Sequence, residues 1–213
     1  MEAPSGTVKY HPGLMDTRHE TNDTRRRLLD ALAEVIADKG YAATTIADLA
    51  TTAHVSKRSF YEQFDDKAEA LIALYDTATR QSFEVLRRAI DPARDWHAQL
   101  DQALAAYLGT LASNPPLLRT LFIEIMALGP RGLAARRRTT ETFADFIVQV
   151  AGPALPRPLA LAIVGGIHEW VLQAVEQDTV TALPQLAGPA AQLVRAVVDA
   201  APEPQAVAPT APG

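Results

Sequence analysis

The chain has 213 residues, of which 48% are hydrophobic, 21% are charged and none is cysteine. So many hydrophobic residues exclude a disordered protein and predict either one large core or a small domain beside a larger one. The lack of cysteine excludes disulfides and thiolate metal sites, and the net charge of -5 means that any binding to nucleic acid depends on where the cations lie.

Two features bear on the location of the protein. Met1 is followed by Glu2, where a secretory signal would carry a basic and then an apolar run. The longest apolar run, from Leu159 to Ile167, is too short to cross a bilayer. We therefore expect a soluble, cytoplasmic protein with no membrane partner.

The first segment is predicted to be an arm followed by a helix. Residues 1–21 mix glycine and proline without an apolar period, which predicts a flexible arm. A helix is expected from Asn22 or Asp23, with Gly40 placed to end it. Its buried stripe consists of Leu28, Leu29, Leu32, Val35 and Ile36. The arginine run 25–27 is expected on a solvated face, with one member touching the DNA backbone.

Two short helices are predicted between Thr45 and Phe64. Thr45 and Asp48 are spaced as a capping box at the start of the first helix, and Ser56 can cap the second. Phe60 and Phe64 lie four residues apart, so they share one face of the second helix and are expected to point inward. Two short helices joined by a tight turn, the second with polar outward residues, describe a helix-turn-helix.

The rest of the chain is also predicted to be helical. A long fourth helix runs from about Ala68 to Ile90, and beyond Asp91 the composition shifts toward alanine and leucine, as at the start of a second domain. Further helices separated by glycine or proline are expected to include 100–111, 117–126, 143–150, 158–175 and 181–200. Pro189 is expected to kink or restart the last of them. Residues 201–213 read as a disordered tail.

The segment TRRRLLDALAEVIADKGYAATTIADLATTAHVSKRSFYEQFDDKAEALIALYD resembles the N-terminal domain of the tetracycline-repressor (TetR) family. The stripe of the first helix, GY, TTIADLA, VSKRSFY and DDKAEAL all fall in register. The chain departs from the family at His54, where a glycine is usual. It departs again at Glu62 and Gln63, which replace an aromatic or polar residue and a histidine.

The resemblance implies an all-α fold. A three-helix helix-turn-helix domain would be joined by a long fourth helix to a larger helical domain for ligand binding and dimerisation. We accordingly divide the chain into an arm (1–21), a DNA-binding domain (22–82, with the helix-turn-helix at 45–64), a ligand-binding and dimerisation domain (83–200) and a tail (201–213).

The second short helix is predicted to read DNA. With Phe60 and Phe64 inward, a rotation of about 100° per residue points Arg58, Ser59 and Glu62 outward. An arginine can bind guanine with two hydrogen bonds, and a glutamate can accept one from cytosine. The resemblance implies phosphate contacts from Tyr61, from Lys67 and from either Thr44 or Thr45. The predicted set is Thr44, Thr45, Ser56, Lys57, Arg58, Ser59, Tyr61, Glu62, Gln63 and Lys67, although Ser56 has the alternative role of a cap.

A homodimer is expected because a single recognition helix buries too little surface to select one site in a genome. The partner would be a palindromic operator in double-stranded DNA. The last two helices are the expected interface, with candidates Gly165, Gly166, Leu193 and Val197. For the two glycines, which cost helix stability, packing within one chain explains their presence equally well.

A ligand pocket is expected among the remaining helices of the second domain. Its candidates interrupt otherwise apolar faces, and each has a core or interface role as the alternative: Tyr107, Glu124, His168, Trp170 and Gln173. The arginine run 136–138 could meet an anionic ligand or form a solvated face. By resemblance, a small, lipophilic effector would bind and release the operator.

Catalysis is not expected. His168 and Glu169 begin a zinc-protease-like HExxH, but Leu172 stands where the second histidine would be. The sequence also lacks a GxSxG elbow, a P-loop and a cysteine nucleophile, so we expect no enzyme, no metal and no cofactor. The expected function is a DNA-binding transcriptional regulator, in the form of a ligand-released repressor. The alternative is a helical protein-interaction scaffold with a weak DNA-binding module.

Overall fold

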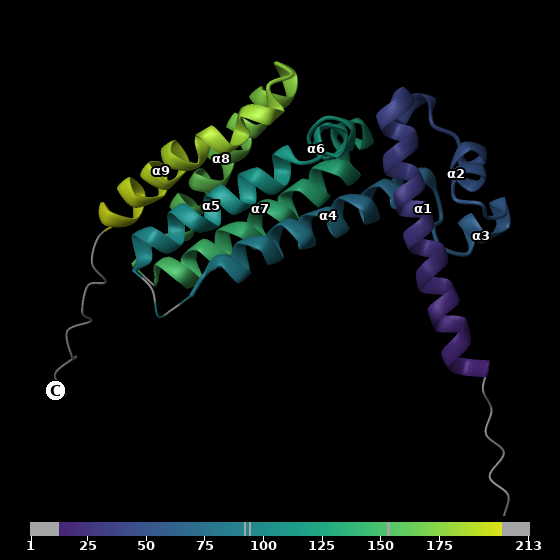
Figure 1. The fold of residues 1–213 in the computed structure, drawn as a ribbon, viewed down its shortest axis with the longest axis horizontal. Helices are drawn as coiled ribbons and strands as arrows, with labels where there is room; N and C mark the ends of the chain where they lie inside the picture. Colours follow the sequence, from purple (N-terminus) through teal and green to yellow (C-terminus); the bar gives the residue numbers. More distant parts are fainter. Residues whose placement is uncertain (1–12, 92, 94, 153, 202–213) are drawn as a thin grey trace, which may run out of the picture. The chain divides into compact units, whose positions relative to one another are not determined.

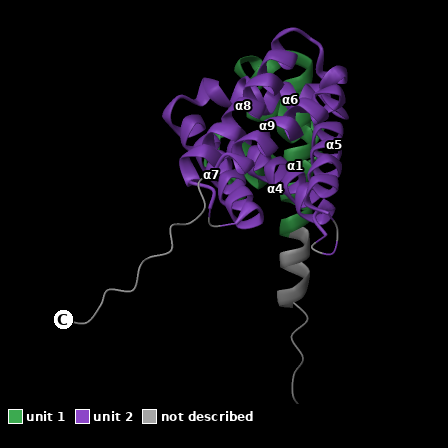
Figure 2. Ribbon diagram, turned by 90° about the vertical axis from the view of Figure 1, so that its left-hand side faces the viewer, with its two compact units in different colours: residues 1–70 green, residues 71–213 purple. Residues whose placement is uncertain are grey.

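The computed structural model describes residues 13–91, 93, 95–152 and 154–201, with side chains from Thr21 onward. Within these residues every regular element is a helix (Figure 1), which confirms the all-α prediction. The chain divides into two compact units, Met1–Ala70 (unit 1) and Leu71–Gly213 (unit 2) (Figure 2). This division falls earlier than the expected domain boundary at residues 82 and 83. The predicted tail, apart from Ala201, lies outside the described residues.

Unit 1 contains α1 (Gly13–Ala43), α2 (Ile46–Thr52), α3 (Lys57–Tyr61) and the first turn of α4 (Lys67–Ala89). The prediction that the first helix begins at Asn22 or Asp23 is wrong, since residues 13–21 are already helical. No proline or glycine stands between residues 14 and 39, so nothing in the chain stops the helix from extending backward. Residues 1–12 of the predicted arm lie outside the described residues.

Gly40 ends the regular part of α1, as predicted. Its φ of 77° and ψ of 162° are non-helical, in a region that a side chain would strain. The chain therefore changes direction before α2. The side chains left with almost no exposure in unit 1 come from three helices and the segment after α3: Leu28, Leu32, Leu49, Phe60 and Phe64.

Unit 2 contains the rest of α4 and seven further helical elements. These are α5 (Trp96–Ala112), α6 (Pro115–Phe122), α7 (Pro130–Ala151), α8 (Arg157–Glu176), α9 (Ala187–Asp199) and the short 3-10 helices η1 (Glu124–Leu128) and η2 (Val180–Leu186). In the core, α7 packs along α8, while α5 packs against η2 and α9. Phe83 and Phe143 pack edge to face between α4 and α7.

Glycine and proline separate these elements, as the sequence predicts. Gly129 and Gly152 have φ values of 57° and 92°, and Asn114 caps α6 by accepting a hydrogen bond from the Leu117 N–H. Two predicted helices are nevertheless divided in two. Residues 117–126 belong to α6 and η1, and 181–200 to η2 and α9. The last helix restarts at Ala187, so that Pro189 lies in its first turn, where a proline is tolerated.

Among the described residues, α8 is the one helix long and apolar enough to cross a membrane by length and composition. The apolar run Leu159–Ile167 is only part of α8, so the shortness of that run does not by itself exclude a membrane span. Of its most apolar window, 44% is buried inside the structure. Ile163, Ile167 and Val171 of α8 belong to the core cluster of unit 2. Core helices pass the same test of length and composition, and we assign α8 to the core.

Candidate DNA-binding surface and ligand cavity

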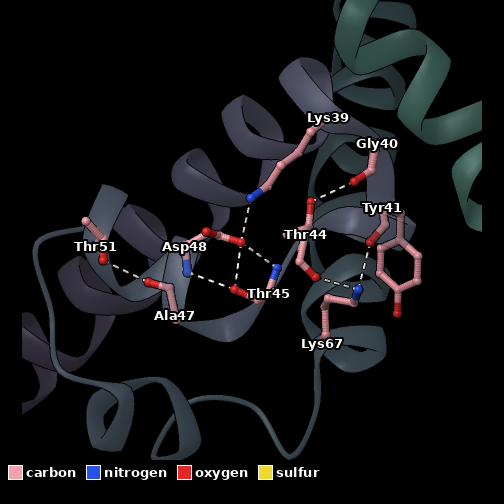
Figure 3. A network of polar contacts seen from close by, with 9 residues as sticks. All are labelled: Lys39, Gly40, Tyr41, Thr44, Thr45, Ala47, Asp48, Thr51 and Lys67. Carbon is pink, nitrogen blue, oxygen red and sulfur yellow. Dashed lines mark hydrogen bonds and ion pairs between the residues drawn. The ribbon is translucent and has the colours of Figure 1, made fainter.

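The start of α2 is held by a capping box that also binds α1 (Figure 3). The Thr45 N–H donates to Asp48 Oδ2 at 2.8 Å, and the Asp48 N–H donates to Thr45 Oγ1 at 3.2 Å. Lys39 Nζ lies 2.7 Å from the same Asp48 oxygen. Hydrogen bonds from Lys39 and then Thr45 hold the pKa of Asp48 well below its usual range. The predicted capping box is confirmed, and its carboxylate stays ionised.

The turn between α2 and α3 is stabilised by an arginine of α1. His54 has a φ of 53°, a left-handed conformation that explains why glycine suits this position. Arg27 donates to the carbonyls of both Ala53 and His54, the latter at 2.8 Å. The Arg27 guanidinium therefore holds the turn in place from α1.

The solvated face predicted for the arginine run 25–27 is wrong for two of its members. Arg25 Nη1 donates to the Gln63 carbonyl at 2.8 Å, and its guanidinium lies 4.3 Å from the centre of the Phe64 ring. Arg27 turns to the helix-turn-helix as well, and Arg26 alone is solvated. The sequence could have predicted this difference. Consecutive residues on a helix are about 100° apart, so three adjacent arginines cannot all share one solvated face.

Helix α3 buries the predicted face, but it ends at Tyr61, so Phe64 lies in the segment that follows rather than in the helix as predicted. Ser56 caps it, with its Oγ accepting from the Ser59 N–H at 3.0 Å. Phe60 is 0% exposed and Phe64 is 2% exposed. The opposite face carries the exposed residues Lys57, Arg58, Tyr61 and Glu62, while Ser59 and Gln63 are half-buried.

Arg58 and Glu62 form an ion pair on this exposed face. Arg58 Nε donates to Glu62 Oε1 at 3.0 Å, with the arginine side chain 89% exposed. Exposed pairs of this spacing contribute only about 0.3–0.5 kcal/mol, so DNA could separate them at little cost. Tyr61, on the same helix, is 58% exposed, and its ring packs edge to face with Phe60.

Two predicted DNA contacts are turned inward. Thr44 is 2% exposed, and its Oγ1 donates to the Gly40 carbonyl at 2.8 Å. Lys67 Nζ donates to the carbonyls of Tyr41 and Thr44, both at 2.7 Å, and lies 4.1 Å from the centre of the Tyr41 ring (Figure 3). Burial lowers the pKa of Lys67. Both side chains join the end of α1 to the start of α2, whereas Thr45 is exposed beside Asp48.

Unit 2 contains a partly open apolar cavity of about 70 Å³ between α4, α5, α7, α8 and α9. Its walls include Leu86, Trp96, Leu104, Phe146 and Val194. A second, more polar cavity of about 30 Å³ adjoins it, with polar walls from Tyr75, Thr79, Ser82, Arg136 and Thr139. Tyr107, Phe143 and His168 line both cavities. Two of the predicted pocket residues therefore lie at the junction.

Tyr107 and His168 are uncharged at neutral pH. The Tyr107 hydroxyl lies 3.4 Å from His168 Nε2, and both residues are buried. Burial, followed by the positive charge of Arg136, lowers the pKa of His168 to about 4. Burial raises the pKa of Tyr107 above its usual range. The junction is therefore a neutral hydrogen-bonding pair within aromatic walls.

The structure separates the other predicted pocket residues from this junction. Trp170 and Gln173 line a groove of about 230 Å³ between α8 and η2. Glu124 is half-buried in η1 and lines neither of the two adjoining cavities. Conversely, Thr139 and Phe143 line the junction region without having been predicted as pocket residues, although they lie four apart on one face of α7 together with Arg136.

Residues 28–74, which contain α2, α3 and the capping box, match the family model of bacterial regulatory proteins of the tetR family. This chain carries the DNA-binding domain of the TetR family of regulators. The match includes both helices of the predicted helix-turn-helix and begins in the buried stripe of α1.

Two curated relatives of this TetR-family chain have similar sequences. Nucleoid occlusion factor SlmA of Marinomonas sp. is 27% identical over 125 residues, which cover 59% of this chain and 62% of SlmA. The transcriptional activator FasR of Mycolicibacterium smegmatis is 26% identical over 126 residues, which cover 59% of this chain and 58% of FasR. The chain thus spans about three fifths of the length of these relatives.

A solved structure confirms the fold. The transcriptional regulator FadR from Bacillus subtilis, in complex with stearoyl-CoA, has a TM-score of 0.69 and 20% identity, over 79% of this chain and 96% of FadR. By their names, FadR and FasR are transcriptional regulators and SlmA is a nucleoid occlusion factor, and none of these names describes an enzyme. This agrees with the expectation that the TetR-family chain is not an enzyme.

The predicted interface residues of this regulator differ in their surroundings. A side chain at Gly165 would meet nothing within 4 Å, whereas one at Gly166 would lie 3.6 Å from Leu193 Cδ2 of the same chain. Packing between α8 and α9 thus gives a reason for Gly166 within one protomer. Gly165 is exposed, and Leu193 and Val197 are half-buried.

Proposed function

We propose that this protein is a ligand-released repressor that binds a palindromic operator as a homodimer, in the cytoplasm. The observation that carries this proposal is the exposed face of α3. Lys57, Arg58, Tyr61 and Glu62 are presented together, while Phe60 and the Arg25 guanidinium hold the helix from behind. A rigid helix with an exposed basic and hydrogen-bonding face suits major-groove readout.

Lys57 and Tyr61 would contact phosphates, while Arg58 and Glu62 would read base edges. In this assignment Glu62 keeps Arg58 extended in the absence of DNA and repels phosphates that the operator does not position correctly. Thr44 and Lys67 act from inside unit 1 by fixing α2. The regulator would therefore depend on base recognition more than on general attraction to the backbone, in line with its net charge of -5.

The dimer would form through α8 and α9. Ala162, Gly165 and Ala196 are small, exposed residues on these helices, and they leave room for another helix to approach closely. Two protomers would present two α3 helices to half-sites about one turn of DNA apart. A ligand in unit 2 would then change the population of the dimer geometry that fits the operator.

The apolar cavity of unit 2 supports a lipophilic effector. Its described walls carry almost entirely aliphatic and aromatic side chains. The FadR structure of the same fold holds stearoyl-CoA, which also has a long apolar chain. Thermal-shift screening of lipophilic compounds is the first way to find the ligand.

The test of DNA recognition is a footprint on the DNA upstream of the gene for this protein. We expect protection of two symmetric half-sites with centres about 10 bp apart, by a dimer whose mass is measured in the same complex. Protection without symmetry, or by a monomer, would contradict the dimeric repressor. Retardation that is the same on any DNA would favour the scaffold alternative.

A further inference from the structure

The polar cavity of unit 2 contains a guanidinium without a carboxylate partner. Arg136 lines this cavity and forms no ion pair with any of the described carboxylates. Its Nη1 lies 3.8 Å from the sulfur of Met126, which is a weak acceptor. By contrast, Arg138 on the same helix pairs with Asp76 at 3.7 Å. Arg136 thus has donors available for another group.

No other charge balances Arg136 at the walls of this cavity. The described residues that line it include three further titratable groups, Tyr75, Tyr107 and His168. Burial raises the pKa of both tyrosines, and burial together with Arg136 lowers the pKa of His168 to about 4. At neutral pH the polar cavity is therefore neutral except for one positive charge.

At the junction between the two cavities, the hydrogen bond between Tyr107 and His168 is weak. Tyr107 Oη and His168 Nε2 are 3.4 Å apart, which is long for a hydrogen bond. Phe143 completes the junction and packs edge to face on the imidazole. Rotation of these rings would connect an apolar compartment to a cationic one, and a chain could then pass between them.

We propose that the effector is a single-chain amphiphile, whose anionic carboxylate or phosphate head binds Arg136 and whose apolar tail passes Tyr107 and His168 into the apolar cavity. Arginine suits both head groups because its planar fork donates two parallel hydrogen bonds. Thr139 and Ser82 offer hydroxyls to the same head. This inference rests on the proposed function, since it names the class of ligand that the regulator binds.

The test compares three probes of equal chain length on the full-length protein: decanoate, decyl phosphate and 1-decanol. Affinity is measured by calorimetry for the unsubstituted protein, Arg136→Gln and Arg137→Gln. Arg137 is the matched control, because it is the adjacent, exposed arginine and lines neither cavity. Thermal unfolding of each variant verifies that it is folded.

We expect at least one anion to bind about tenfold or more tightly than decanol, as for a hydrogen bond to a charged group. Arg136→Gln should remove this preference while decanol binding persists, and Arg137→Gln should retain it. Equal binding of decanol and both anions, or a preference that survives Arg136→Gln, would overturn the assignment. The preferred anion identifies the head group.

Operator release is measured separately with the same probes. If an anion binds through Arg136 but leaves the DNA complex intact, the ligand assignment stands and the release mechanism is contradicted. If decanol releases DNA at the same concentration as the more tightly binding anion, the regulator is ligand-responsive but the role of Arg136 is wrong.

Discussion

At the scale of single residues, the helix-turn-helix depends on side chains that face in two directions. Arg58 is solvated in an exposed ion pair with Glu62, while Lys67 and Thr44 donate to backbone carbonyls. His54 accepts a left-handed conformation in the turn. Substitutions at these positions should therefore separate DNA recognition from stability.

Arg58→Ala should weaken operator binding by about 1–3 kcal/mol and relax specificity at one base pair, because it removes a two-bond contact to guanine. Binding to operator and random DNA is compared by fluorescence anisotropy. Arg26→Ala serves as the control, since Arg26 is also exposed and ion-paired but lies on α1. Equal losses on both DNAs for Arg58→Ala would rule out base reading.

Lys67→Met should lower the free energy of unfolding by about 1–3 kcal/mol, because two carbonyls lose their donor. Partial exposure places the effect at the lower end of this range. Urea denaturation measures it, and Lys57→Met, on an exposed residue of the same unit, should change stability little. A stable Lys67→Met variant that loses DNA binding would instead support the phosphate contact that the resemblance implies.

His54 should be replaceable by glycine without loss. At a φ of 53°, His54→Gly relieves strain of about 1 kcal/mol, partly offset by the entropy of the unfolded glycine. His54→Val should be less stable than either, because a β-branched residue fits this region poorly. The midpoints of urea unfolding of the unsubstituted protein, His54→Gly and His54→Val test this order. A His54→Val variant as stable as His54→Gly would refute it.

His168 should make unit 2 sensitive to acid. Its folded pKa of about 4 lies below the unfolded value of 6.5, so the unfolded chain takes up a proton first as the pH falls. Stability should decrease from about pH 6.5 down to about pH 4, by on the order of 3 kcal/mol. His168→Gln should flatten this decrease, while His97→Gln, on an exposed residue, should not. Identical pH profiles for the protein with and without His168 would show that folding does not shift the pKa of this imidazole.

At the scale of elements, α3 has only five residues and cannot be stable alone. Its position comes from the Ser56 cap, from Phe60, and from the α1 arginines that hold its two ends. The length of α1 matters here, because one rigid helix carries both guanidinium groups.

Arg25→Met should loosen the end of α3 without touching its outer face. We expect weaker binding to all DNA and a loss of stability of about 1–2 kcal/mol, since the Gln63 carbonyl loses a charged donor. Amide hydrogen exchange should show faster exchange in α3. Unchanged amide exchange in α3 would contradict the claim that Arg25 holds this helix in place. Arg26→Met is the matched control, because Arg26 is the neighbouring arginine on the same helix.

The elements could be predicted from the sequence where they depend on residues close together in the chain. The Thr45 and Asp48 box, the Ser56 cap, Gly40 and the inward phenylalanines each depend on residues within four positions, and all are confirmed. Contacts between distant segments could not be read in this way. Arg25 meets Gln63 across 38 positions, and Tyr107 meets His168 across 61. Whether a polar residue faces a cavity or solvent is fixed only by such packing, which explains the separation of Trp170 from the junction.

At the scale of the whole molecule, the proposed regulator combines a DNA-reading unit of weak net charge with a larger helical unit that contains a hydrophobic cavity. In this proposal, general attraction to phosphate is weak and operator binding would require two copies of α3 acting together. The ligand class proposed for unit 2 refines this view, but sequence-specific DNA binding has to hold first.

The most direct measurement is the ratio of affinities for the footprinted operator and a scrambled sequence of equal length, at physiological salt. The proposed repressor predicts a ratio of about 10³ or more, as for other specific DNA-binding proteins. It also predicts that the ratio falls when one half-site is scrambled. A ratio near one would contradict the claim that α3 reads a specific sequence.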